Sequence, residues 1–223
     1  MKIALFGLTY LVGIGELLLA IYFWVTNSKS EIRRVMAFLA LSLSLWVLFN
    51  GIFGVHLPTK LHSVIFTAPY VFGVFILSFL FHFSVVYPLK TFSFDRLHAT
   101  FLYAIASIFS FAILFSTTIV DRFFVHDNGS IGIIGGPLYG LYNFYLSVLM
   151  LLSLALIVYK YRQIQGIPKR NVQLILWSSI ITGVPAFITS VFHLAPTFPY
   201  NFLIGPIASG FWLVAVTVII RRS

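Results

Sequence analysis

The chain has 223 residues, of which 60% are hydrophobic and 9% are charged, and its mean hydropathy is +1.03. A water-soluble domain carries roughly 25% charged residues, so the composition excludes one and predicts an integral membrane protein. The net charge of +9 does not indicate nucleic-acid binding, because the basic residues lie between apolar runs and not in a stripe with exposed aromatics. The absence of cysteine excludes disulfides and Cys-ligated metals.

Long apolar runs occupy nearly the whole chain. A transmembrane helix needs roughly 20 apolar residues, and backbone groups in lipid must be satisfied within a helix or a closed barrel. The runs lack period-two alternation, so they predict helices. We therefore expect an all-α membrane protein, a single seven-transmembrane domain over residues 1–223. The predicted spans are residues 3–26, 35–55, 64–87, 99–120, 138–161, 172–194 and 201–220.

Positive charge is concentrated in the connections on one side of the predicted bundle. The loops after spans one, three and five, together with the C-terminus, hold eleven Lys and Arg residues, and the opposite side holds three. Because Lys and Arg are retained in the cytoplasm, this predicts an external N-terminus and a cytoplasmic C-terminus. We expect contacts with anionic lipid heads or a cytoplasmic partner at Arg33, Arg34, Arg162, Lys169 and Arg170.

The connection at residues 121–137 is the longest external loop. Two short apolar arms, residues 123–125 and 131–134, flank an Asp-Asn-Gly-Ser turn, which favours a small β-hairpin over an irregular loop only marginally. Three prolines are predicted to lie inside spans, where they free backbone carbonyls and bend helices. These prolines are Pro69, Pro185 and Pro206.

Ionisable side chains within spans are candidates for function, because burying them in lipid costs about 2.5 to 3.5 kcal/mol on insertion scales. Glu16 is the clear case, near the middle of span one between Gly13 and Gly15. Three environments suit it: a protonated state, a hydrogen bond to a neighbouring hydroxyl or amide, or a wet cavity. A ligand or proton role competes with that of a satisfied structural carboxyl. His82 is expected to be a hydrogen-bond partner between helices.

Polar tips among aromatic residues recur in the outer third of several spans. Counting about 1.5 Å per residue from the outer side places five such side chains at similar depth. They suit an outward-facing vestibule for a small ligand, and they also suit an ordinary interfacial aromatic belt. With Glu16, they are the candidate ligand-binding residues: Asn50, Tyr70, Tyr142, Asn143 and His193.

Several function classes fail on specific residues. A retinal protein needs a lysine in its last span, and the predicted span at 201–220 has none. The chain lacks paired intramembrane carboxylates and the motifs of zinc proteases, serine hydrolases and P-loop enzymes. We therefore expect no enzyme activity, catalytic residue, cofactor or metal site. Gly205 and Ser209 permit a close helix contact, either inside the bundle or in a homodimer.

Four short motifs in order resemble the N-terminal seven-transmembrane sensor region of bacterial histidine kinases. They are Arg33-Arg-Val-Met-Ala-Phe38 with Leu45-Trp46, Phe81-His-Phe-Ser-Val-Val-Tyr-Pro88, Gly136-Pro-Leu-Tyr139, and the stretch from Tyr161 to Gln173 that contains Tyr-Arg, a small linker and Arg-x-Gln. The resemblance implies an environmental sensor in a bacterial cell membrane, whose last helix passes its state to a cytoplasmic output domain or partner. Here the sequence stops at Arg221-Arg-Ser223, where an output domain is expected, and nothing in it suits ATP binding or phosphate transfer.

A sensor module for an external small ligand or membrane condition is thus the favoured function. A small-solute transporter or channel is the alternative, and it requires a continuous polar path. A non-catalytic membrane assembly protein is the other, and it requires no pocket.

Overall fold

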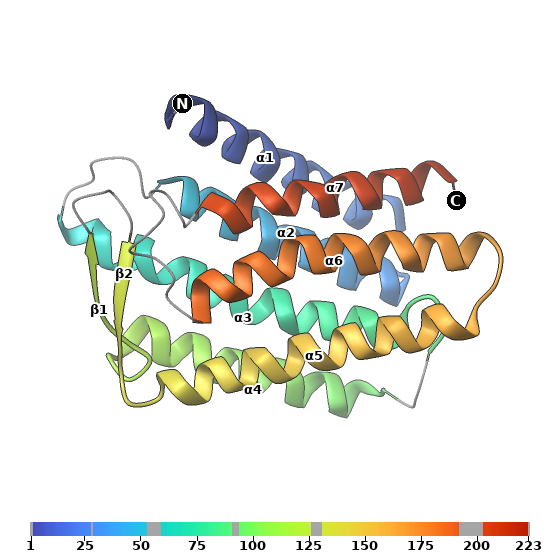
Figure 1. Ribbon diagram of the computed structural model, residues 1–223. Helices are drawn as coiled ribbons and strands as arrows, with labels where there is room; N and C mark the ends of the chain where they lie inside the picture. The colour runs from blue at the N-terminus through green and yellow to red at the C-terminus, as the bar shows by residue number, and fades with distance from the viewer. Residues whose placement is uncertain are drawn as a thin grey trace.

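The computed structural model describes residues 2–27, 29–52, 59–90, 94–125, 131–191 and 203–222. Within these ranges the chain forms seven helices and one two-stranded sheet, and the helices lie side by side along a common direction (Figure 1). The elements are α1 (Lys2–Asn27), α2 (Glu31–Ile52), α3 (Thr59–Val86), α4 (Arg96–Phe115), β1 (Val120–Val125), β2 (Ile131–Gly135), α5 (Tyr139–Gln163), α6 (Ile167–Val191) and α7 (Ile204–Arg222).

The two ends of the bundle differ. The N-terminus and the sheet lie at one end, which we call the sheet end, and the α5–α6 connection and the C-terminus lie at the other, which we call the basic end (Figure 1). An odd number of helices places the termini at opposite ends, as the predicted topology requires. Which end faces the cytoplasm stays a prediction.

Helices α1 to α5 are long and apolar enough to cross a membrane, and residues 204–220 of α7 form a shorter apolar helix. Large apolar side chains are exposed along α4 at intervals of three and four residues, among them Phe101, Ile105, Ile108 and Phe111. In water such a continuous apolar stripe would be unfavourable, whereas lipid tails are its natural surroundings. The chain is therefore a membrane-spanning protein.

Several predicted boundaries need correction. The second span begins at Glu31 rather than at residue 35, and the third at Thr59 rather than at residue 64. The fourth span ends at Phe115 rather than at residue 120, because the Ser116 hydroxyl and amide both donate to the Ala112 carbonyl oxygen and Val120 already belongs to β1. The sixth span begins at Ile167 rather than at residue 172. Gly166 takes a positive φ of 74°, which reverses the chain so that α6 starts at once.

The three prolines predicted to lie inside spans differ in their positions. Pro69 and Pro185 lie inside α3 and α6, as predicted. The expectation that Pro206 bends a span was wrong, because α7 begins at Ile204 and Pro206 falls in its first turn. At that position the missing amide hydrogen costs nothing, since first-turn amides have no partner inside the helix.

The two strands pair antiparallel, with Phe123 opposite Ile133 and a register irregularity between Val120 and Arg122. The intervening residues 126–130 lie outside the described residues, so the turn and its external position stay predictions. β1 packs against α3. α3 thereby contacts α2, α4, α5 and the sheet, which makes it the most connected helix of the bundle.

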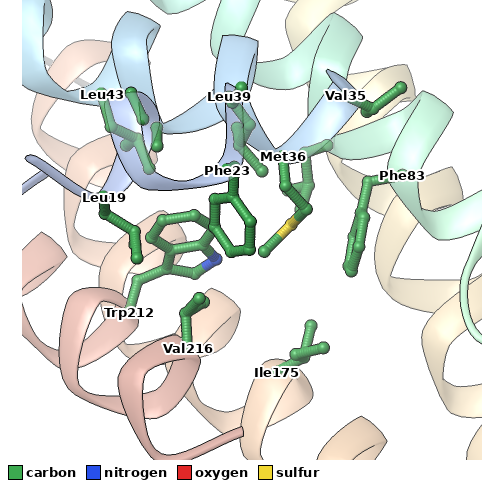
Figure 2. Close-up of a cluster of buried hydrophobic side chains, with 14 of the residues drawn as sticks. Leu19, Phe23, Val35, Met36, Leu39, Leu43, Phe83, Ile175, Trp212 and Val216 are labelled. Carbon is green, nitrogen blue, oxygen red and sulfur yellow. The ribbon is translucent and has the colours of Figure 1, made fainter. Parts of the chain in front are cut away.

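The main core lies between α1, α2, α3, α5, α6 and α7. Figure 2 shows Phe23 of α1, Met36 of α2, Phe83 of α3, Ile175 of α6 and Trp212 of α7 converging on one space. Two smaller clusters fill the space between α3, α4 and α5. With no hydrophobic force between helices in lipid, this close packing is what holds the bundle together.

Candidate functional site

Tyr70 and Tyr142 join α3 to α5 near the sheet end. The Tyr142 hydroxyl donates a hydrogen bond to the Tyr70 carbonyl oxygen at 3.0 Å, and the two ring centroids are 6.3 Å apart. Tyr142 is 3% exposed, and Phe109 of α4 meets its ring edge-on at 6.0 Å. The two tyrosines predicted to share a depth are therefore in direct contact.

The sheet reaches the same cluster through Phe123 of β1. Its ring centroid lies 5.3 Å from that of Phe66 and 5.9 Å from that of Tyr70. Phe66 precedes Pro69 by one turn, and Tyr70 follows it directly. Phe123 therefore contacts α3 on both sides of its proline. We call Phe66, Tyr70, Phe123 and Tyr142 the aromatic cluster.

Asn143 extends this cluster along α5. Its side chain is partly buried and interacts with that of Tyr139, whose ring stacks on Tyr142 with centroids 6.2 Å apart. Tyr70, Tyr142 and Asn143 thus form one neighbourhood of an amide and phenols among apolar walls. That composition suits a small ligand with both polar and apolar parts.

Asn50, another predicted ligand residue, makes its hydrogen bond within its own helix and not to this neighbourhood. Asn50 is buried, but its amide donates to the Trp46 carbonyl oxygen of its own helix at 2.7 Å. Its neighbour Gly51 packs against Tyr10 of α1. His193 lies outside the described residues, so its place in a vestibule stays a prediction.

Glu16 occupies a separate site between α1 and α7. Its side chain is fully buried beside Ser209 of α7. Neither carboxyl oxygen has a hydrogen-bond partner among the described residues. Because Ser209 faces Glu16 within the same chain, its small side chain serves packing inside the bundle. A homodimer contact elsewhere stays a prediction.

A third polar cluster near the basic end connects three helices. Nδ1 of His82 on α3 lies 2.6 Å from the Tyr103 hydroxyl of α4, and its Nε2 lies 3.3 Å from a carboxylate oxygen of Glu31 on α2. The neutral imidazole satisfies both contacts if Tyr103 donates to Nδ1 and Nε2–H donates to Glu31. The prediction that His82 bonds between helices is confirmed. Sequence reasoning missed Glu31 and Tyr103, whose only signal is a polar group near the basic end of a neighbouring span.

The sequence analysis also did not identify the particular role of Lys160. It was counted with the loop cations, but its side chain is 3% exposed, and its ammonium donates to the carbonyl oxygens of Val85 and Tyr87 at 2.8 and 2.7 Å. These carbonyls end α3, where the helix dipole places partial negative charge. Lys160 therefore fastens the end of α5 to the end of α3.

The five basic residues predicted as cytoplasmic contacts cluster at the basic end. Arg33 and Arg34 lie in the first turn of α2, and Arg162 ends α5. Lys169 and Arg170 lie in the first turn of α6, and the Lys169 ammonium sits 4.9 Å from the centre of the Tyr161 ring. Arg34, Arg162 and Arg170 are exposed, so their charges are free to meet lipid heads or a partner.

Within the described ranges, no group of three or more His, Cys, Asp or Glu side chains is arranged to hold a metal ion.

A membrane-spanning bundle of seven helices, joined across by polar contacts at both ends, defines the class as a polytopic membrane protein. The chain belongs to the family described as the N-terminal 7TM region of histidine kinase, whose model matches residues 8–223. That family is a membrane sensor region and not a catalytic domain, so the resemblance inferred from the motifs is confirmed. A search of curated proteins found no match.

Proposed function

We propose that the chain senses a small ligand or membrane condition at the sheet end and passes a helix rearrangement to a cytoplasmic partner at the basic end. One observation carries the proposal: α3 holds both a contact of the aromatic cluster and the His82 cluster. Tyr70 and His82 are twelve residues apart on one helix, or roughly 18 Å along its axis. A shift of α3 at one end must therefore reach the other.

The orientation in this proposal rests on charge. The basic end carries Arg33, Arg34, Arg162, Lys169 and Arg170, and such an excess of cations favours the cytoplasmic side. The sheet end then faces outward, with the aromatic cluster beneath the sheet. A cytoplasmic partner would meet the exposed arginines beside the lipid surface.

Pro69 is the point at which an outside stimulus acts on α3. A proline inside a helix removes one internal hydrogen bond and weakens the helix locally. Phe123 contacts the helix on both sides of this point, so a displacement of β1 changes the bend. The Tyr142 hydrogen bond to the Tyr70 carbonyl oxygen stabilises the present geometry of α3 next to Pro69.

Signal transfer follows from differential binding. A ligand shifts a two-state equilibrium only by the ratio of its affinities for the two packings. A ligand among Tyr70, Tyr142 and Asn143 would bind better to the packing that fits it, and α3 would carry that choice to Glu31 and Tyr103 through His82. The resulting movement of α2 and α4 changes the surface offered at the basic end.

Transmission along α3 can be measured directly, because the chain has no cysteine and a single introduced thiol reports alone. Leu89 follows α3 at the basic end and is 65% exposed, so Leu89→Cys accepts a thiol reagent. Tyr142→Phe removes one hydrogen bond, worth about 1 kcal/mol or roughly fivefold in an equilibrium. We expect it to change the labelling rate in lipid nanodiscs by up to about that factor, and the exposed control Tyr159→Phe to leave it unchanged. Equal rates in all three proteins would refute transmission through α3.

The ligand is sought by a thermal-shift screen of small molecules on the nanodisc protein. A hit supports the site if it raises the melting temperature of the wild type and of Tyr159→Phe, but not of Tyr142→Phe or Asn143→Ala. Binding that survives both substitutions would place the ligand elsewhere.

A further inference from the structure

The two glycines that flank Glu16 lie in close contact with side chains of α2 and α7. A Cβ placed on Gly15 would lie 2.7 Å from Cδ2 of Leu213 on α7, and one on Gly13 would lie 2.8 Å from Cδ2 of Leu48 on α2. At such distances the two leucine side chains would have to move aside. The glycines thus allow α1 to lie close to α2 and α7, and the Glu16 side chain is fully buried there.

The hydroxyl protons near Glu16 are already committed. Ser209 lies beside the carboxyl, but its hydroxyl donates to the Pro206 carbonyl oxygen at 2.7 Å. Ser44 of α2 donates to the Gly13 carbonyl oxygen at 2.8 Å. Ser209 is close enough to interact with the carboxyl, but neither carboxyl oxygen has a donor in hydrogen-bond geometry among the described residues.

Among the described residues, none of the ion pairs involves Glu16. The residues that contact this part of α1 include Ser44, Val47 and Leu48 on α2 and Ser209, Gly210 and Leu213 on α7. None of them is an acid, a base or a cation. An ionised carboxylate buried without a donor or a counter-charge costs several kcal/mol.

A carboxylic acid fits the same surroundings. It brings its own O–H donor, and the Ser209 oxygen still has lone pairs free to accept, because a hydroxyl combines one donor with two acceptor sites. A protonated Glu16 could therefore donate to Ser209, whose own hydroxyl donates to the Pro206 carbonyl oxygen.

We propose that Glu16 and Ser209 form a proton-binding site that closes α1 against α7. When the proton leaves to water, the carboxylate needs a donor. Ser209 supplies one only by turning its hydroxyl away from Pro206, and otherwise the interface opens to water. The loss of the Ser209–Pro206 bond or the entry of water weakens the contact of α1 with α7, so proton binding is a second input to the bundle, independent of the aromatic cluster and of the function proposed above.

Infrared spectroscopy tests for the bound proton, and the small number of acidic residues simplifies assignment of the carboxylic acid band. The chain has only five acidic residues. Glu31, Asp95 and Asp121 have side chains 47, 63 and 38% exposed, so they lie in contact with solvent, unlike Glu16. We expect the full chain in nanodiscs at pH 7 to have the carbonyl stretch of one neutral carboxylic acid. It should be lost in Glu16→Gln and kept in Glu31→Gln, and its absence from the wild type or its survival in Glu16→Gln would overturn the proposal.

Spin labels test whether the proton holds the helices together. Leu18 of α1 and Val214 of α7 are each 62% exposed, and the absence of native cysteine allows labels at only these two positions. As the pH is raised until the acid band disappears, the distance distribution between the labels should shift in the wild type. Glu16→Gln keeps a neutral donor for Ser209, so its distribution should not move with pH. A wild-type distribution that ignores loss of the band, or an equal shift in Glu16→Gln, would overturn the coupling.

A further variant covers the case in which Glu16→Gln does not fold. Ser209→Ala removes the acceptor and keeps the carboxyl. We expect it to retain the acid band at the higher frequency of a carboxylic acid with no hydrogen bond. An unchanged band frequency would exclude Ser209 as the acceptor.

Discussion

Replacing Lys160 with methionine should destabilise the bundle far more than its position beside a loop suggests. Methionine keeps most of the length and the apolar stem but removes the ammonium, which donates to Val85 and Tyr87. Val85 is fully buried, so its carbonyl oxygen loses a partner that water cannot replace. A buried acceptor left unsatisfied costs about 1 to 3 kcal/mol. Tyr87 is only half-buried, and water can recover part of its lost bond.

Together the two carbonyls give an expected loss of about 2 to 4 kcal/mol in the free energy of unfolding. The assay is denaturation of the full chain in mixed micelles, followed by circular dichroism. Arg162→Met is the matched control, because it removes the same charge two residues further along α5 from an exposed side chain. Exposed substitutions of this kind change stability by at most about 0.5 kcal/mol. A loss for Lys160→Met no larger than that of the control would refute the reasoning.

Three further substitutions test other contacts. Tyr103→Phe removes the hydroxyl bonded to His82 and should lower the unfolding free energy by about 1 kcal/mol in the same denaturation assay, and an unchanged value would contradict that bond. Asp95 caps α4, and a hydrogen bond from a backbone amide of the first turn, with an adjacent histidine, holds its pKa below the ordinary value. This stabilises the fold above the ordinary carboxyl range and is lost as the pH falls through the lowered pKa, so Asp95→Asn should flatten the acid side of a melting-temperature profile. Gly136→Ala would place a Cβ against the carbonyl oxygens of the residues before β1, so this variant should melt well below the wild type. The control Gly140→Ala meets open space within a helix and should be neutral or stabilising by up to about 1 kcal/mol. Equal melting curves for the two variants would refute the clash.

Some site residues were within reach of the sequence. Counting depth at a fixed rise per residue put Tyr70, Tyr142 and Asn143 at one level, and they are neighbours in the structure. The same count put Asn50 there, but its amide bonds inside its own helix. Depth follows from residue number alone, whereas the direction of a side chain depends on the rotation of its helix, which packing decides.

Helix boundaries illustrate the same limit. The stop of α3 before Pro88 was predictable, because a proline and the preceding residue resist helix geometry locally. The early end of α4 was not, since residues 116–120 are apolar or small and fit a span by hydropathy. Val120 belongs to a strand because β1 pairs with β2, and this contact between separate segments is not visible in the local sequence.

The number, order and apolar character of the helices were determined by the sequence itself, because lipid allows a backbone to cross only when each long apolar run satisfies its own hydrogen bonds. The partners of its few polar groups were decided by the tertiary structure. The sequence groups Lys160 with the loop cations, whereas in the structure its ammonium donates to two carbonyl oxygens at the end of α3. The sequence placed Glu16 inside a span but left its role open. The structure places it beside α2 and α7, where the hydroxyls of Ser44 and Ser209 donate to backbone carbonyl oxygens. Local composition sets where a chain enters the membrane, and only the packing of distant helices sets what each buried group can bind.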